Sequence, residues 1–449
     1  MSEAGLWEDA RRTPLLAETE VLVLGGGPAG IAAAASAAAA GRRVLLVERY
    51  GFLGGMGTAA GVTNFCGLHA NLRGTMRQVV HGVADELLQR IDALGGLNAP
   101  HSIFGRTWAQ AYDGAAYKCA ADELLLARGV RLLFHAQAAG VAMRESGQID
   151  ALFVETRSGR RAIRALQFID CSGDGDLVHW AGAPWEQGDA HGDLLYPTLM
   201  FRVAGVDDAR AGEAWREVGP RMLQAQRAGR HRFARQGAIL RPMKHSGEWR
   251  VNVTQIRNAQ GRAMDGTDAL QLSAGEVEGR RQVREFFAFL RAEMPGFENA
   301  YLLEIAPQVG IRETRRLLGR AVLTEDEVLG CADVDDAIGV NAWPLEQHVA
   351  GDVKWRWPAE GSRGYNQLPW RMLLPQGVPN LLVAGRCASM NAAAQSAARV
   401  SGACFVMGQA AGLGAALALQ AGSAPADIDV AALQRGLQAQ GAWLGREST

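Results

Sequence analysis

Cysteine is scarce in this chain, and no two cysteines stand close enough to form a motif. The 449 residues contain six cysteines, and none of them stands in a C-x-x-C spacing. Zinc sites and redox-active dithiol motifs need paired cysteines, so the sequence predicts neither. We therefore expect reduced and mostly buried thiols, and no bound metal ion.

The chain also lacks an excess of charge of one sign. It has 46 lysines and arginines against 47 aspartates and glutamates, which gives a formal net charge of -1. No overall field then attracts nucleic acid or an anionic membrane, and we expect neither as a partner. Hydrophobic residues make up 48% and charged residues 21% of the chain. This composition is typical of a globular protein and argues against extended disorder.

No apolar run is both long and uninterrupted. Residues 21–40 match a membrane span in length, but glycines and a proline at positions 25–30 interrupt the run. Arg11 and Arg12 are not followed by the apolar segment that an export signal requires. The sequence therefore predicts no membrane insertion and a cytoplasmic location.

A glycine-rich turn stands between two short apolar runs near the amino end. Residues 21–24 and 44–47 are predicted to be buried parallel strands, since they are apolar and rich in valine. The turn at 25–30 reads G-G-G-P-A-G, and an alanine-rich helix is predicted over 29–40. This order of strand, turn, helix and strand is typical of a unit that binds a dinucleotide.

Each glycine of the turn has a physical task. Gly25 allows the tight turn, Gly27 lets the backbone approach a pyrophosphate, and Gly30 lets the helix pack on the strand. Free N–H groups at the start of the helix favour the phosphates. Glu48 follows the second strand at the distance expected of a carboxylate that binds a ribose hydroxyl.

A family resemblance indicates which dinucleotide is bound. The segment from Glu48 to Met56 resembles the stretch after the second strand in glutathione-reductase-like flavoproteins, where paired glycines pass close to FAD. Gly54 and Gly55 fit that approach, because a Cβ would clash there. The chain is similar to the FAD-dependent oxidoreductase family over roughly residues 20–420. The segments that carry the resemblance are 169–176, 276–281, 295–300, 310–316 and 384–387. In the first of them, Cys171-Ser172 stand where relatives often have a small residue and a threonine.

The resemblance implies FAD as the cofactor and redox chemistry as the activity. The residues that it places at the cofactor are Gly25, Gly27, Pro28, Ala29, Gly30, Glu48, Arg49, Gly54, Gly55, Met56, Asp174, Gly385, Arg386 and Gly408. Asp174 can contact FAD or simply cap a helix.

The fold class predicted is α/β, with a Rossmann-type FAD-binding domain whose parallel sheet is discontinuous in sequence. Residues 17–189 supply its first part and residues 362–424 its return segment, with a mixed α+β substrate domain inserted at 190–361 and a tail at 425–449. Helices are predicted over 78–94, 115–128 and 273–293, the last with Ser273 as its cap, and strands over 198–203 and 249–254.

Arginines cluster at positions 312–316, which we predict to begin a helix. Arg312 and Arg316 would then share a face, and together they could hold a carboxylate in bidentate fashion. A helix joined to its surroundings by ion pairs, with Glu313 as a partner, is the alternative. The resemblance favours a place beside the flavin for Arg312.

Two histidines are candidates for acid–base work. In relatives, the region of His348 ends in a histidine near the substrate pocket, and His348 is our first candidate. His69 follows the glycines that approach FAD and could act as a base, contact the substrate or link the flavin covalently. Cys66 could also form such a covalent link. A loop histidine and a packed thiol are the alternatives. Several aromatic residues could form a wall around the substrate or belong to the hydrophobic core: Trp343, Trp355, Trp357, Tyr365 and Trp370.

The function predicted is that of an FAD-dependent oxidoreductase, a dehydrogenase or oxidase that passes a hydride between a small organic substrate and flavin N5. A single dinucleotide fingerprint is present, so oxygen or an external acceptor would reoxidise the flavin. One alternative is an FAD-dependent monooxygenase with an external reductant. Another is a flavin-carrying RNA-modification or assembly protein. The oligomeric state stays open.

Overall fold

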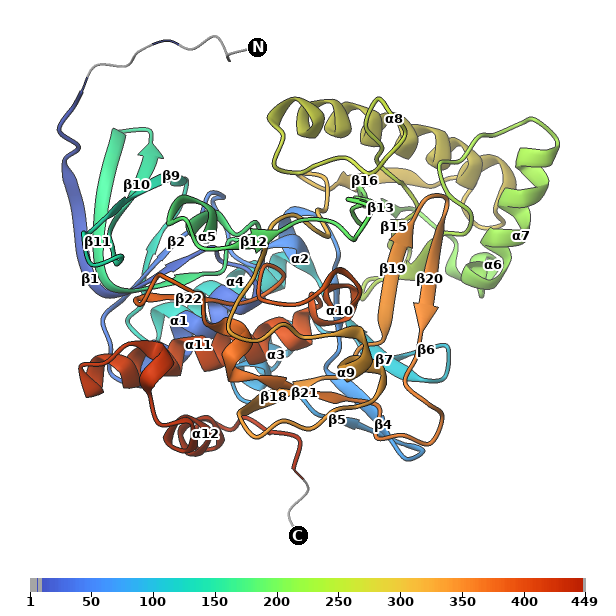
Figure 1. The fold of residues 1–449 in the computed structure, drawn as a ribbon. Coiled ribbons are helices and arrows are strands. Elements are labelled where there is room, and N and C mark those ends of the chain that lie inside the picture. Colours follow the sequence, from blue (N-terminus) through green and yellow to red (C-terminus); the bar gives the residue numbers. More distant parts are fainter. Residues whose placement is uncertain (1–5, 7–9, 447–449) are drawn as a thin grey trace.

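A computed structural model describes residue 6 and residues 10–446 of the chain. Its largest sheet contains five parallel strands in the order β8-β2-β1-β11-β22 (Figure 1). These strands are β8 (Arg131–Leu133), β2 (Val44–Val47), β1 (Leu15–Leu24), β11 (Gly159–Asp170) and β22 (Leu381–Val383). The antiparallel strands β10 (Ile149–Thr156) and β9 (Gln137–Met143) continue from the first half of β11. The predicted α/β fold with a discontinuous parallel sheet is confirmed.

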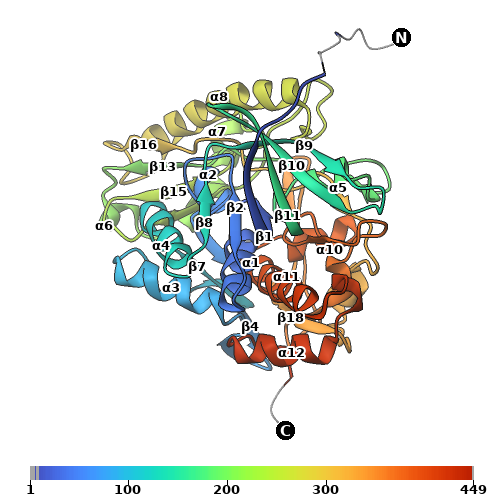
Figure 2. The same cartoon turned by 90° about the vertical axis from the view of Figure 1, so that its left-hand side faces the viewer.

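One face of this sheet carries two small-residue helices, α1 (Pro28–Ala39) and α11 (Ser401–Ala421), which lie side by side (Figure 2). Their glycines permit the close packing, because a Cβ at Gly408 would lie 2.0 Å from the carbonyl oxygen of Ala29. α11 is long and apolar enough to cross a membrane, but 83% of its apolar window is buried inside the fold. It is therefore a core helix of this protein.

Smaller elements surround these two helices. They are α2 (Met56–Ala59), β3 (Asn64–Cys66), β4 (His69–Leu72), β5 (Thr75–Gln78), α3 (Val83–Ala93), β6 (His101–Ile103), β7 (Thr107–Ala111), α4 (Gly114–Leu126), α5 (Asp176–Trp180), α9 (Glu325–Leu329), α10 (Ala392–Ala398) and α12 (Val430–Ala439). The short 3-10 helices η1 (Trp370–Leu373) and η2 (Pro425–Asp427) lie near the carboxyl end of the chain.

A second, antiparallel sheet has its own hydrophobic core. Its order is β14-β15-β13-β16, and the helix α8 runs along it (Figure 1). The elements are β13 (Phe201–Ala204), α6 (Asp208–Ala211), α7 (Ala214–Arg227), β14 (Ile239–Pro242), β15 (Trp249–Asn252), α8 (Ala269–Glu293) and β16 (Tyr301–Ile305). The core residues of this region run from Leu199 to Ile311. These helices and strands form a mixed α+β unit, which is inserted in the sequence between β11 and β22.

A β-hairpin extends from the core around α1 and α11 to the region of the antiparallel sheet. β19 (Leu345–Val349) and β20 (Asp352–Arg356) form it, and Gln255 donates a hydrogen bond to the carbonyl oxygen of Val349 over 2.8 Å. β18 (Ala337–Asn341) pairs with β21 (Asn366–Pro369), and Leu345 packs in the first core. The short strands β12 (Trp185–Glu186) and β17 (Arg316–Leu317) also pair.

Two local predictions are wrong. Residues 312–315 form an irregular segment that leads into β17, not a helix, because Glu313, Thr314 and Arg316 are each buried with partners from elsewhere in the fold. The long helix α8 begins before Ser273: the Asp268 side chain accepts hydrogen bonds from two backbone N–H groups of its first turn. Tertiary partners and a nearer cap outweighed the local pattern.

Candidate functional site

A cavity of about 500 Å³ runs between the carboxyl ends of the parallel strands and the antiparallel sheet. The glycine turn at 25–27, Glu48, Gly55 and Gly385 line one end. Strands β14 and β15, the β19–β20 hairpin and the segment around Arg312 line the other. Ligand sites in open α/β sheets lie at this edge.

The glycine turn leaves free backbone where a phosphate would bind. Gly25 has a φ of +98°, and a Cβ at Gly30 would lie 1.8 Å from the carbonyl oxygen of Gly25, so both positions are closed to side chains. By contrast, a Cβ at Gly27 would meet only the Cα of Gly55, at 3.6 Å. Gly27 therefore has room that the fold itself does not use, at the N-terminus of α1. The turn fits the pyrophosphate of FAD.

Glu48 is buried beside the turn. Its carboxylate accepts hydrogen bonds from the backbone N–H of Gly26 at 2.6 Å and from that of Tyr50 at 3.0 Å. Burial raises the pKa of Glu48, while these hydrogen bonds oppose the shift. The side chain also lines the cavity, where it can accept a hydrogen bond from a ribose hydroxyl.

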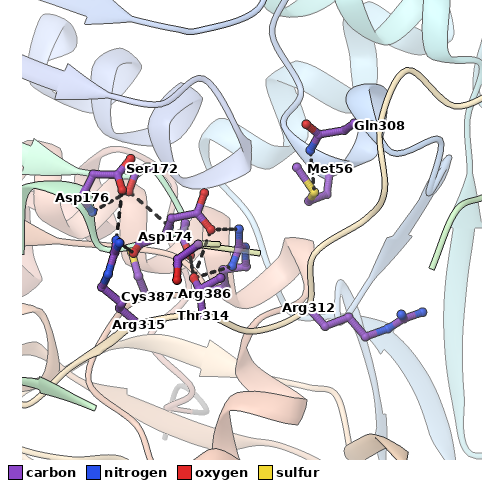
Figure 3. A network of polar contacts seen from close by, with 12 residues as sticks. Met56, Ser172, Asp174, Asp176, Gln308, Arg312, Thr314, Arg315, Arg386 and Cys387 are labelled. Atoms are coloured by element: carbon purple, nitrogen blue, oxygen red, sulfur yellow. Dashed lines mark hydrogen bonds and ion pairs between the residues drawn. The ribbon is translucent and has the colours of Figure 1, made fainter. Parts of the chain in front are cut away.

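Asp174 joins two of the arginines near this end. Arg386 donates to it at 2.6 Å and Thr314 at 3.0 Å (Figure 3). Arg49 donates to it at 3.4 Å. Burial raises the pKa of Asp174, but the charges of Arg386 and Arg49 outweigh it, so the pKa lies below its ordinary value. Arg315 pairs in the same way with Asp176, at 3.2 Å. Arg386, Arg49 and Arg315 are thus each paired with an aspartate of the chain itself.

His348 and Glu346 form a hydrogen-bonded pair in the other end of the cavity. The His348 Nε2 lies 3.1 Å from the Glu346 Oε1, and the indole N–H of Trp343 donates to Glu346 at 2.9 Å. Burial raises the pKa of Glu346, but hydrogen bonds from His348 and Trp343 and the charge of Arg399 lower it to about 2. Burial and the charge of Arg312 lower the pKa of His348 well below its ordinary value.

The protonation of this pair follows from those shifts. An ionised carboxylate only accepts hydrogen bonds, so the neutral ring of His348 carries its proton on Nε2. The Nδ1 then holds the lone pair and is a proton acceptor. His348 lines the cavity, and this arrangement can serve as a base that a carboxylate orients.

Five arginines line the same end: Arg235, Arg241, Arg250, Arg312 and Arg399. Arg312 reaches away from the Asp174 network (Figure 3) and donates to the carbonyl oxygen of Tyr196 at 2.5 Å. Within residues 10–446, no carboxylate lies within 4.0 Å of a nitrogen of any of these five side chains. Sequence reasoning found only Arg312 among them. The available signal was an arginine inside an otherwise apolar strand, as with Arg250 between Trp249 and Val251.

Comparison with known proteins identifies the family. The family model described as FAD dependent oxidoreductase matches residues 20–437. The chain belongs to this family. The predicted enzyme class and the predicted cofactor, FAD, are thereby confirmed. No curated protein matches.

Three solved structures are similar in fold to this FAD-dependent oxidoreductase and distant from it in sequence. A geranylgeranyl bacteriochlorophyll reductase-like protein from Thermoplasma acidophilum is 14% identical, with 94% of this chain and 82% of that chain covered and a TM-score of 0.47. The p-nitrophenol 4-monooxygenase from Pseudomonas putida is 11% identical, with 96% and 90% covered and a TM-score of 0.46. A ternary complex of aklavinone-11 hydroxylase with FAD and aklavinone is 14% identical, with 90% and 63% covered and a TM-score of 0.44.

The structure separates the predicted cofactor residues of this oxidoreductase into two sets. Those that line the cavity are Gly25, Gly27, Pro28, Ala29, Glu48, Arg49, Gly55, Met56, Gly385 and Arg386. Gly30, Gly54 and Gly408 lie behind it: Gly30 supports the turn, Gly54 donates its N–H to the Gly26 carbonyl at 2.8 Å, and Gly408 packs α11 on α1. Asp174 orients Arg49 and Arg386 from behind. Asp174 does not cap the helix α5; its first turn is capped by Asp170, which accepts a hydrogen bond from the N–H of Leu177.

His69 lies outside the cavity, in strand β4, and is buried against Trp108 with a ring distance of 5.7 Å. Its Nδ1 has no hydrogen-bond partner among the described residues, and burial lowers its pKa to about 4. The prediction of a flavin-facing loop is corrected here, because the chain turns into strand β4 after Gly67. Cys66 does line the cavity, but burial raises its pKa to about 12. Its thiol is therefore a poor nucleophile.

Proposed function

We propose that this FAD-dependent oxidoreductase oxidises a small organic molecule that binds between the glycine turn and the arginine-lined end of the cavity. When bound, FAD supplies a hydride acceptor at flavin N5, and oxygen or an external acceptor takes up the electrons. The chain's own residues position the substrate, exclude water and accept its proton. The observation that carries the proposal is the His348–Glu346 pair, whose hydrogen bond of 3.1 Å lies in the cavity wall.

His348 is the proposed base. Its neutral ring takes the proton of a substrate hydroxyl or amine on Nδ1 while the C–H bond gives up its hydride, so one proton and one hydride leave the substrate together. Glu346 holds the ring in one tautomer and stabilises the cation that forms. Burial and the charges of Arg312 and Arg399 keep the resting pKa of His348 low, so the base stays deprotonated at neutral pH.

The experiment that tests this function is anaerobic reduction. The FAD-loaded protein is mixed without oxygen with a panel of alcohols, amines and hydroxy acids, and bleaching of the flavin absorption is followed. We expect at least one compound to reduce wild type, and His348→Asn to slow the reduction about 100-fold with little change in the concentration for half-saturation. A product that carries an oxygen atom from O2 would contradict the proposal and favour a hydroxylase. A His348→Asn protein that reacts at the wild-type rate would remove His348 from the mechanism.

A further inference from the structure

The arginine-lined end of the cavity holds positive charge that the chain leaves unmatched. Arg235, Arg250 and Arg312 are each at most 8% exposed. Within the described residues, their hydrogen bonds go only to backbone carbonyl oxygens. Arg235 donates to those of Gly237 and Asn252, Arg250 to that of Val62, and Arg312 to that of Tyr196. A buried guanidinium without a carboxylate is costly, since each of these side chains loses its hydration in exchange for one or two hydrogen bonds to the chain.

Several donor atoms in this group have no partner at all. The Nε of Arg250, the Nε of Arg399 and the Nη1 of Arg241 are buried without an acceptor among the described residues. All three side chains line the cavity. Buried donors of this kind are normally satisfied, so these call for an acceptor that enters from the cavity.

Three neighbouring strands carry facing arginines, and those at the cavity differ from the one outside it in having no described carboxylate nearby. Arg202, Arg250 and Arg241 stand directly opposite one another on β13, β15 and β14. Arg202, outside the cavity, has Asp113, Glu248 and Glu304 within 4.0 Å. Arg250 and Arg241, at the cavity, have no carboxylate that close in the described part of the chain. Like charges directly opposite one another are unfavourable in a sheet unless something compensates them.

The pKa values of neighbouring groups are consistent with excess positive charge at this end of the cavity. Burial, Arg250 and Arg241 lower the pKa of His101 to about 4. Burial lowers the pKa of Arg235 and of Arg250 to about 10. Two described carboxylates line this end: Glu346, which is engaged by His348 and Trp343, and the exposed Asp352. Their charges raise the pKa of Arg235 less than burial lowers it.

The cofactor does not account for these arginines. The phosphate site lies at the glycine turn, where Arg49 and Arg386 are matched by Asp174. Arg235, Arg241 and Arg250 come from the antiparallel sheet and the loop before it, on the opposite wall.

We infer that the substrate is an organic carboxylate, whose oxygens accept hydrogen bonds from Arg250 and Arg235 while its oxidisable carbon lies towards His348. The guanidinium fork matches a carboxylate in bidentate geometry. The tryptophans beside the arginines, Trp343 and Trp355, supply an apolar wall for the rest of the molecule. This inference rests on the proposed function, since it names the substrate class of the same cavity.

Anion binding to the FAD-loaded protein tests the inference without turnover. Benzoate and succinate are titrated against benzamide and succinamide, their uncharged counterparts, and inorganic phosphate is a third probe. The perturbation of the flavin spectrum and the shift in melting temperature are both recorded. We expect at least one carboxylate to bind and its amide to bind at least tenfold more weakly. Arg250→Met and Arg235→Met should each weaken carboxylate binding about 30-fold or more, with FAD content unchanged. Arg250→Lys should restore only part of the affinity.

The controls decide what the variants mean. Arg284→Gln, on the exposed face of α8, should bind as wild type does. Equal binding of amides and carboxylates, equal binding of phosphate, or no binding of any carboxylate would overturn the inference. So would loss of FAD from both arginine variants, since the arginines would then serve the cofactor. If the protein takes up no FAD at all, the proposed function fails, while the melting-temperature shifts still decide the inference.

Discussion

The two ends of the cavity treat arginine in opposite ways. At the glycine turn, Arg49 and Arg386 are held by Asp174, and Arg315 is held by Asp176. At the far end, Arg235 and Arg250 bond only to backbone carbonyl oxygens. The first end is matched by carboxylates of the chain, and we propose that a bound anion completes the second.

The difference separates stability from function. A matched arginine fixes the geometry of a site before any ligand arrives, which suits a cofactor that stays bound. An unmatched arginine costs stability in the free protein and recovers that cost when an anion binds. The same residue type therefore has opposite effects on folding at the two ends.

The largest effect is expected at the matched end. Asp174→Asn leaves Arg386, which is 9% exposed, and Arg49 without their carboxylate. The free energy of unfolding should fall by about 3 kcal/mol, measured by urea denaturation. Because the pKa of Asp174 lies below its ordinary value, its stabilisation is present above about pH 4 and is lost as the pH falls through the lowered pKa, and the variant should lack this loss. Asp193→Asn, in an exposed pair with Arg262, should change stability by less than about 1 kcal/mol. Equal effects of the two substitutions would contradict the comparison.

The next effect concerns the base. Glu346→Gln removes the ionised partner of His348 and frees the imidazole to adopt the other tautomer. We expect anaerobic flavin reduction to slow about 100-fold with FAD content unchanged. Stopped-flow absorbance measures the rate, and an unaltered rate would show that Glu346 serves packing alone.

A smaller effect separates His69 from the site. The pKa of His69 is about 4, below the ordinary value of 6.5, so between those pH values the unfolded chain binds more protons than the folded one. Stability therefore falls as the pH drops from about 6.5 to about 4. His69→Gln should reduce the loss of unfolding free energy between pH 7 and pH 5 by about 1–2 kcal/mol. Its flavin reduction should match wild type, and a large loss of rate would return His69 to the site.

The smallest effect has the opposite sign. Arg250→Met removes an unmatched buried charge, so the ligand-free protein should gain about 1 kcal/mol of stability. Arg202→Met, on the facing position of the adjacent strand, removes a matched charge and should lose about 2 kcal/mol. Urea unfolding of both variants without added anions measures the pair. Destabilisation of similar size in both would mean that Arg250 is already compensated.

The sequence was most informative where the backbone does the work. Gly25, Gly27 and Gly30 and the following acid predict a strand, a turn and a helix from local geometry, and the structure has these elements there. The FAD and family predictions rested on the stretch from Glu48 to Met56 and on five further segments along the chain, and the family match confirms them.

The far end of the cavity could not be predicted in this way, because its residues meet only in three dimensions. Arg235 and Arg250 belong to the antiparallel sheet and the loop before it, Glu346 to the β19–β20 hairpin, and Arg399 to the end of α10. The helix predicted at 312–316 is absent for a related reason. The arginines there have helical spacing, but Arg316 forms a buried ion pair with Glu313 in an irregular segment. Gly408 was assigned to the cofactor, although its lack of a side chain serves helix packing.

Removal and return of FAD tests the central claim most directly, with Gly27→Ala as the variant. A Cβ at Gly27 has space within the folded chain, with its nearest neighbour at 3.6 Å, but it would occupy the approach of a pyrophosphate. We predict that the apoprotein of wild type takes up one FAD per chain, and that Gly27→Ala unfolds at the same urea concentration yet binds FAD at least about tenfold more weakly. An apoprotein that takes up no FAD, or a variant with unimpaired affinity, would contradict the account.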